Sequence, residues 1–140
     1  MKNIILFVLI LSFVACNNSK KAAKDPDPSQ LDGTWVLNYI SGPRIAFEGL
    51  YPNKKPQLVF TSADKRLSGN TGCNSFSGPL VVDGYKISFD QPLALTKMFC
   101  PGEGETVFLE TLKKINTYSV SGNTLNLIMG DIAMMRFSKK

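Results

Sequence analysis

Short apolar, β-branched stretches separated by turn residues run through positions 31–140, and this pattern restricts the fold more than any other feature of the chain. Asp83-Gly84 separates the stretches 80–82 and 85–89, and Ser121-Gly122-Asn123 separates 118–120 from 124–128. Asp-Gly and Gly-Asn pairs in such positions favour β-hairpins. Further strands are predicted at 35–40, 57–61, 66–69, 93–98 and 132–137. Many short strands joined by turns indicate a small barrel-like domain or a sandwich.

One helix is predicted among the strands, over residues 105–116. Phe108, Leu112 and Ile115 recur there at helical spacing, which places them on one face. Glu103 and Glu105 suit the positive end of the helix, and we interpret them as capping residues. The apolar face is expected to pack on the sheet. The predicted fold class is therefore mainly β (α+β), a small antiparallel β-barrel-like domain with one helix packed on it.

The first sixteen residues differ from the rest of the chain. Residues 4–14 are almost purely apolar, but this run is shorter than the roughly 20 residues that a membrane-spanning helix needs. It ends at Ala15-Cys16, which resembles the lipobox of a bacterial lipoprotein. We therefore predict a signal peptide at 1–15 and a lipid on Cys16 that anchors the protein in the bacterial cell envelope. Asn17, in place of Asp, favours the outer membrane by analogy with sorting rules.

A flexible tether is predicted after the anchor, so that residues 16–30 comprise the lipidated cysteine and its linker. Residues 17–30 contain no large apolar side chain and cannot bury enough surface to become ordered. Pro26 and Pro28 disfavour helix in the residues before them. This polar, proline-containing stretch also argues against the alternative that residues 4–14 form a buried core helix. The domain proper is predicted at 31–140.

The chain contains no histidine, which excludes several kinds of site. No Ser-His-Asp or Cys-His catalytic set and no histidine-ligated metal can form. The net charge is +5, and 12 basic against 9 acidic residues lie scattered over 31–140 without an interleaved aromatic stripe. We therefore expect no nucleic-acid partner. We also expect no enzymatic activity, no cofactor and no metal site, and a monomer.

Two stretches carry a more specific pattern: 67–78, LSGNTGCNSFSG, and 95–101, LTKMFCP. With the helix that follows, they are similar to the META domain, the HslJ-like family of bacterial envelope lipoproteins. The family pattern G-x-x-G-C-N-x-[FY]-x-G, then T-x-M-x-C-P, then E-x-x-[FL]-x-x-x-L maps onto these residues: Gly69, Gly72, Cys73, Asn74, Phe76, Gly78, Thr96, Met98, Cys100, Pro101, Glu105, Phe108 or Leu109, and Leu112. The resemblance covers 31–140. It implies a compact β-barrel-like domain with one helix, and phenotypes in heat shock, stress response and drug tolerance, but no defined activity.

The segment 69–78 is predicted from its own residues to be a tight, irregular loop. Glycines permit positive φ or close backbone approach, and asparagines bond to nearby backbone. Such a loop either stabilises a corner of the barrel or frames a binding site, and we favour the corner. If it binds a partner, the candidate residues lie in this loop and in the adjacent 96–102 segment: Asn70, Gly72, Asn74, Phe76, Thr96, Met98 and Phe99.

Two cysteines remain once Cys16 is assigned to the lipid. An exported protein meets an oxidising compartment, so we predict that Cys73 and Cys100 are bonded or close enough to bond. Two buried free thiols, or a redox or metal pair, are the alternatives. Two thiolates leave a metal incompletely coordinated unless carboxylates join them.

The function predicted is that of a membrane-anchored, non-catalytic binding or scaffold module with an envelope protein as partner. A carrier of a small apolar ligand in the barrel interior is one alternative. Buried Trp35, Phe60, Phe89, Leu127 and Phe137 would count against it. An inhibitor that acts on an envelope enzyme through an exposed loop is another.

Overall fold

The computed structural model describes residues 26–140. The predicted signal peptide, Cys16 and the tether as far as residue 25 lie outside the described residues. The elements follow in chain order: η1 (Pro28–Leu31), β1 (Gly33–Ile40), α1 (Phe47–Leu50), β2 (Gln57–Thr61), β3 (Arg66–Asn70), β4 (Ser75–Pro79), β5 (Val81–Asp83), β6 (Lys86–Ser88), β7 (Ala94–Leu95), α2 (Gly104–Lys113), β8 (Thr117–Ser121), β9 (Thr124–Met129) and β10 (Ile132–Lys139).

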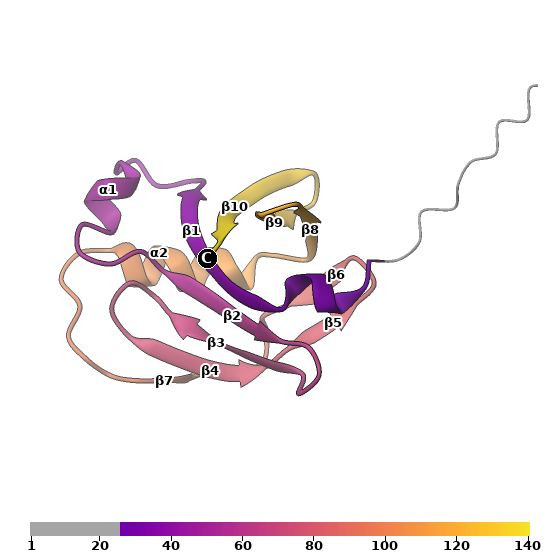
Figure 1. Cartoon of the computed structure of the whole chain (residues 1–140). Helices are drawn as coiled ribbons and strands as arrows, with labels where there is room; N and C mark the ends of the chain where they lie inside the picture. The colour runs from indigo at the N-terminus through magenta and orange to yellow at the C-terminus, as the bar shows by residue number, and fades with distance from the viewer. Residues whose placement is uncertain (1–25) are drawn as a thin grey trace, which may run out of the picture.

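The strands form one curled antiparallel sheet, in the order β5-β6-β8-β9-β10-β1-β2-β3-β4-β7. The terminal strands of this order, β5 and β7, pair only on one side, so the sheet is a half-barrel and not a closed barrel. Figure 1 shows the sheet curving around α2. The prediction of a mainly β, barrel-like domain with one helix is confirmed, since α1 and η1 are single turns.

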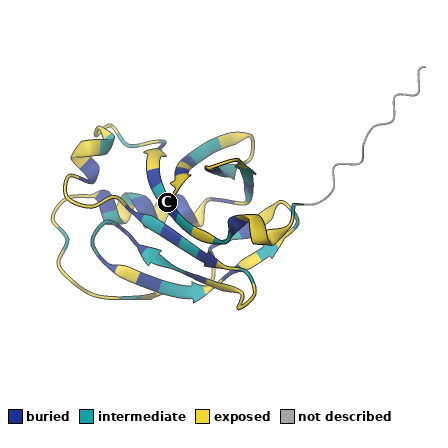
Figure 2. Cartoon of the chain, viewed as in Figure 1, coloured by how far each residue is buried: buried dark blue, intermediate teal, exposed yellow. Residues whose placement is uncertain are grey.

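The core lies between the inner face of the sheet and α2 (Figure 2). In β1, Trp35 and Leu37 point inward, and a bulge after Leu37 shifts the alternation so that Ile40 is the next buried residue. Other strands contribute alternate side chains, which are Leu58, Phe60, Leu67, Leu125, Leu127, Met135 and Phe137. Phe108, Leu112 and Ile115 are buried as predicted, although α2 ends at Lys113 and leaves Ile115 in the connection to β8.

Two segments differ from the sequence-based expectation. Residues 75–78 lie in the predicted loop but belong to β4 (Ser75–Pro79), which pairs with β3 along its whole length. The predicted strand 93–98 shortens to Ala94–Leu95, because the amide of Met98 bonds to the Asn74 side chain and not to a neighbouring strand. No helix of residues 26–140 is long and apolar enough to cross a bilayer.

The domain begins slightly earlier than predicted. Pro28–Leu31, assigned largely to the tether, forms a 3-10 turn whose N-cap, Asp27, accepts a hydrogen bond from the amide of Ser29. Leu31 is fully buried, and its carbonyl accepts a hydrogen bond from the Trp35 indole. These contacts hold the turn against the core. The polar composition of residues 17–30 did not predict this packing.

Candidate functional site

The turn between β3 and β4 is built from its own polar side chains. Asn70 accepts a hydrogen bond from the amide of Gly72 at 3.0 Å, and Thr71 Oγ1 accepts one from the amide of Asn74 at 3.0 Å. Gly72 has a φ of 94°, and a Cβ there would lie 2.9 Å from the carbonyl oxygen of Lys54. A side chain at this position would therefore be both strained and in collision.

Asn74 connects this turn to the segment that follows β7. Only 1% of the residue is exposed. Its Oδ1 accepts hydrogen bonds from Thr96 Oγ1 and from the amide of Met98, both at 2.8 Å. Its Nδ2 lies 3.1 Å from the carbonyl oxygen of Met98 and 3.1 Å from Glu105 Oε1. A buried amide with all its partners in place holds the segment rigidly.

Glu105 brings the helix into the same cluster. Thr71 Oγ1 donates a hydrogen bond to Glu105 Oε2, and the amide of Asn74 lies 3.3 Å from that oxygen. Glu103 occupies the N-cap position and Glu105 lies in the first turn, as expected for acidic residues at the positive end of the helix. Neither caps the helix through its side chain, because Glu103 makes no cap bond and Glu105 bonds to the β3–β4 turn. Thr71 and this role of Glu105 were missed. The Glu of the family pattern was the signal that could have found the latter.

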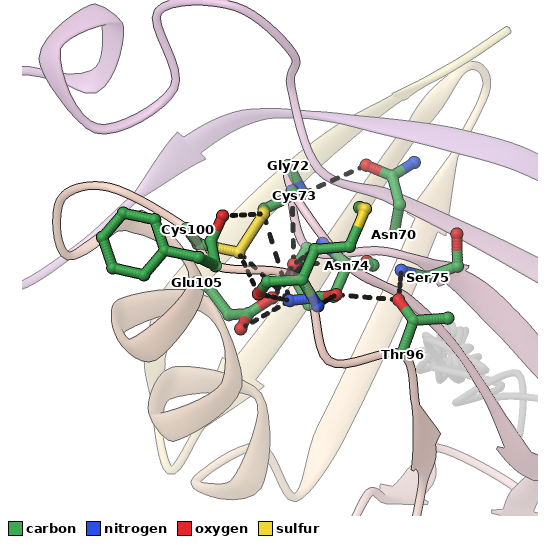
Figure 3. The surroundings of a disulfide bond; sticks show 11 residues. Asn70, Gly72, Cys73, Asn74, Ser75, Thr96, Cys100 and Glu105 are labelled. Carbon is green, nitrogen blue, oxygen red and sulfur yellow. Dashed lines mark hydrogen bonds between the residues drawn. A yellow bond between two sulfur atoms is a disulfide. The ribbon is translucent and has the colours of Figure 1, made fainter.

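The predicted disulfide is present between Cys73 and Cys100, whose Cα atoms are 6.0 Å apart. Figure 3 shows the bond beside the side chains of Asn74 and Glu105. We call the set of residues 70–74, 96–101 and Glu105 the disulfide corner. Asn74 and the disulfide each join the β3–β4 turn to the 96–101 segment, so this segment is fixed by two links.

The candidate binding residues divide into two groups. The disulfide corner contains Asn70, Gly72, Asn74, Thr96, Met98 and Phe99. Phe76 does not belong to it, because its side chain points into the core, with its ring centroid 6.1 Å from that of Phe108. Phe99 is 90% exposed and Met98 is 59% exposed. We call these two residues the Met98–Phe99 tip.

A cavity of about 160 Å³ lies against the disulfide corner. Its lining includes Tyr51, Lys54, Cys73, Cys100 and Glu105. Tyr51 donates a hydrogen bond to the carbonyl oxygen of Gly104 at 3.0 Å, and burial raises the pKa of its hydroxyl well above the usual range. This contact fixes the start of α2 and with it Glu105.

The structure therefore agrees with the favoured interpretation of the glycine-rich segment, and its alternative as the frame of a binding site stays a prediction. Its polar side chains form a structural corner, as favoured, and are bonded to one another. The same corner carries two exposed apolar side chains on a fixed backbone. These features define a half-barrel β domain with a disulfide-closed corner. Residues 29–140 match the META domain, and the chain belongs to that family.

Solved structures support the fold. An NMR structure of a protein from Burkholderia xenovorans is 24% identical and aligns with a TM-score of 0.62 over 89% of this chain and 96% of that one. A crystal structure of a DUF4847 family protein from Bacteroides vulgatus is 17% identical, with a TM-score of 0.52 over 79% of this chain and 94% of that one. No curated protein gives a significant match to the chain.

Proposed function

We propose that this protein is a lipid-anchored envelope lipoprotein whose META domain is a non-catalytic binding module, and that the Met98–Phe99 tip docks on an envelope protein during stress or drug exposure. The observation that carries the proposal is the 90% exposure of Phe99 in a segment held by both Asn74 and the disulfide. The association of the family with bacterial envelope proteins supports the location. The lipid on Cys16 and the outer membrane rest on the sequence pattern.

An exposed aromatic ring on a fixed backbone is well suited to binding. Burying a large aromatic side chain removes about 150–250 Å² from water. At about 25 cal/mol per Å², such burial contributes several kcal/mol to an interface. A segment already ordered by the disulfide corner loses little conformational entropy on association. The folded domain gains almost nothing from Phe99, so its exposure is better explained by a partner than by stability.

The position of the tip favours a protein partner over the anchoring membrane. Pro28, near the start of the described chain, lies beside Ser62 and Lys65 in the β2–β3 turn. The Met98–Phe99 tip lies beside the β3–β4 turn, at the other end of β3. Figure 1 shows the chain entering the domain at the end opposite α1 and the 96–103 connection. The tip therefore faces away from the end that carries the tether.

The alternatives receive less support. Trp35, Phe60, Phe89, Leu127 and Phe137 are all buried and fill the interior that a carried ligand would need. The polar groups of the disulfide corner bond to one another, which leaves no evident set of free groups for catalysis. Inhibition of an envelope enzyme remains compatible with the tip, because a rigid exposed loop is also what an inhibitor presents.

The test is site-specific photocrosslinking in cells. A photoreactive amino acid replaces Phe99 in one strain and Ile132, which is 57% exposed on β10, in a control strain. We expect a discrete protein adduct from position 99 and none from position 132. In a further pair of strains the photoreactive group replaces Lys97, and the yield of its protein adduct should be lower with Met98→Ala than with Met98 intact. Adducts with lipid alone, or none at all from position 99, would contradict the proposal.

A further inference from the structure

The structure places the carboxylate of Glu105 beside the two cysteines. The sequence did not predict this third group that could bind a metal ion. One Sγ atom from each of Cys73 and Cys100 and one carboxylate oxygen of Glu105 lie within 4.8 Å of one another. All three residues are partly exposed. Figure 3 shows the three side chains converging from the β3–β4 turn, the 96–101 segment and α2. In the disulfide form the sulfur atoms are bonded to each other and cannot act as thiolate ligands.

We propose that the disulfide corner is a redox-dependent zinc site, in which Cys73, Cys100 and Glu105 bind one Zn²⁺ after the disulfide is reduced. The proposal goes beyond partner binding and does not depend on it. An external dithiol supplies two electrons and two protons, becomes a disulfide itself, and leaves two protein thiols. Zn²⁺ then displaces the two thiol protons and accepts electron pairs from both thiolates and from the carboxylate.

The geometry suits tetrahedral zinc. Zn–S bonds of about 2.3 Å and Zn–O bonds of about 2.0–2.2 Å require donor atoms about 3.5–3.8 Å apart. One carboxylate oxygen lies within 4.8 Å of both sulfur atoms. Zinc binding therefore requires the carboxylate to approach by up to about 1 Å and the two sulfur atoms to separate by rotation of their side chains. The adjoining cavity of about 160 Å³ is large enough to admit the ion and a water molecule as fourth ligand.

The neighbouring groups are those that a thiolate site needs. Asn74 Nδ2 lies 3.1 Å from Cys100 Sγ and 3.1 Å from Glu105 Oε1, so it can donate to two of the ligands, with the N–H that faces Cys100 shared with the carbonyl oxygen of Met98. Thr71 donates to the other carboxylate oxygen of Glu105 and orients it. Such outer contacts fix ligand orientation and strengthen metal sites.

The experiment uses the full chain in detergent with Cys16→Ser, which leaves Cys73 and Cys100 as the only cysteines. Zn²⁺ binding is measured by competition with a chromogenic chelator, with and without a phosphine reductant, because dithiols bind zinc themselves. Alkylation of the thiols with and without Zn²⁺ gives a second readout. Fluorescence of the buried Trp35 reports whether the reduced chain is folded.

We expect one Zn²⁺ per reduced chain, none per oxidised chain, and protection of both thiols from alkylation. Glu105→Gln keeps the size of the side chain and should weaken binding by about tenfold or more, whereas Glu103→Gln should leave it unchanged. Equal affinity in the reduced wild type and in Glu105→Gln overturns the proposal, as does binding to the oxidised chain. A reduced chain that unfolds and is not restored by Zn²⁺ overturns it as well.

Discussion

The side chain of Asn74 bonds to both main-chain groups of Met98, accepting from its amide at 2.8 Å and facing its carbonyl oxygen at 3.1 Å. An asparagine amide paired with one residue in this way imitates a neighbouring β-strand. It therefore ends the strand pairing of β7 and turns the backbone outward at the point where Met98 and Phe99 become exposed.

Replacement of Asn74 by Ala should destabilise the domain by about 3 kcal/mol, because partly buried groups of Thr96, Met98 and Glu105 each lose a hydrogen-bond partner. Thr96→Val removes one of the hydrogen bonds to Asn74 and should cost only about 1 kcal/mol. Urea unfolding monitored by tryptophan fluorescence gives both values. Equal losses for the two variants would show that the network does not depend on Asn74.

Loss of the disulfide should lower the free energy of unfolding by about 3–4 kcal/mol, because the bond links residues 27 positions apart and restricts the unfolded chain. The double variant Cys73→Ala with Cys100→Ala and the reduced wild type should give similar urea midpoints. Both should lie below that of the oxidised protein. A midpoint unaffected by reductant would contradict the expected role of the bond.

Local signals explain which parts of the fold could be predicted. The β8–β9 hairpin follows from Gly122 and its flanking residues, and the buried stripe of α2 follows from spacing alone. β4 could not be found in this way, since Ser75, Ser77 and Gly78 have little intrinsic preference for strands. Its pairing with β3 comes from tertiary contacts, including the burial of Phe76 against α2.

The candidate site, like the fold, has parts that could be predicted from the sequence and parts that depend on tertiary contacts. The disulfide could be predicted because only two cysteines remained once Cys16 was assigned to a lipid and the chain was expected to be exported. The bond between Asn74 and Glu105 spans 31 residues, and nothing in the local sequence of either indicates the other. In the sequence, Phe76 and Phe99 are both aromatic residues near glycines. Phe76 is buried because of its place in the alternation of β4, whereas Phe99 lies outside the strands and is exposed.

Phe99→Ala should change stability by no more than about 0.5 kcal/mol, because an exposed side chain contributes little to the core. Phe76→Ala is the matched comparison and should cost about 3–5 kcal/mol through loss of burial and the cavity left behind. Thermal and urea unfolding measure both. A large loss in Phe99→Ala would mean that the tip packs on the fold and is not available to a partner.

Gly104→Ala should destabilise the domain by about 2 kcal/mol although alanine favours helices. A Cβ at this position would lie 2.4 Å from the carbonyl oxygen of Leu50 and 2.9 Å from the Tyr51 ring, and the main-chain oxygen cannot move freely. Thr106→Ala, at an exposed position of the same helix, is the control and should be neutral or slightly stabilising. If Gly104→Ala were as stable as Thr106→Ala, the close contact between α1 and α2 would not restrict the side chain at position 104.

Stability should fall at alkaline pH because burial raises the pKa of Tyr51. Tyrosines in the unfolded chain release protons near pH 10, while Tyr51 in the folded domain stays protonated. The folded state therefore binds more protons above about pH 10, and the free energy of unfolding decreases by up to about 1.4 kcal/mol per pH unit for this group. Tyr51→Phe should remove this part of the slope, at a cost near neutral pH of about 1 kcal/mol for the lost bond to Gly104. The Tyr51→Phe variant should retain a smaller dependence of stability on pH, due to Tyr118, whose pKa is raised by burial and by Asp27 and Tyr85. Urea unfolding from about pH 8 to about pH 11 tests this, and an identical slope in wild type and Tyr51→Phe would assign the alkaline loss to other groups.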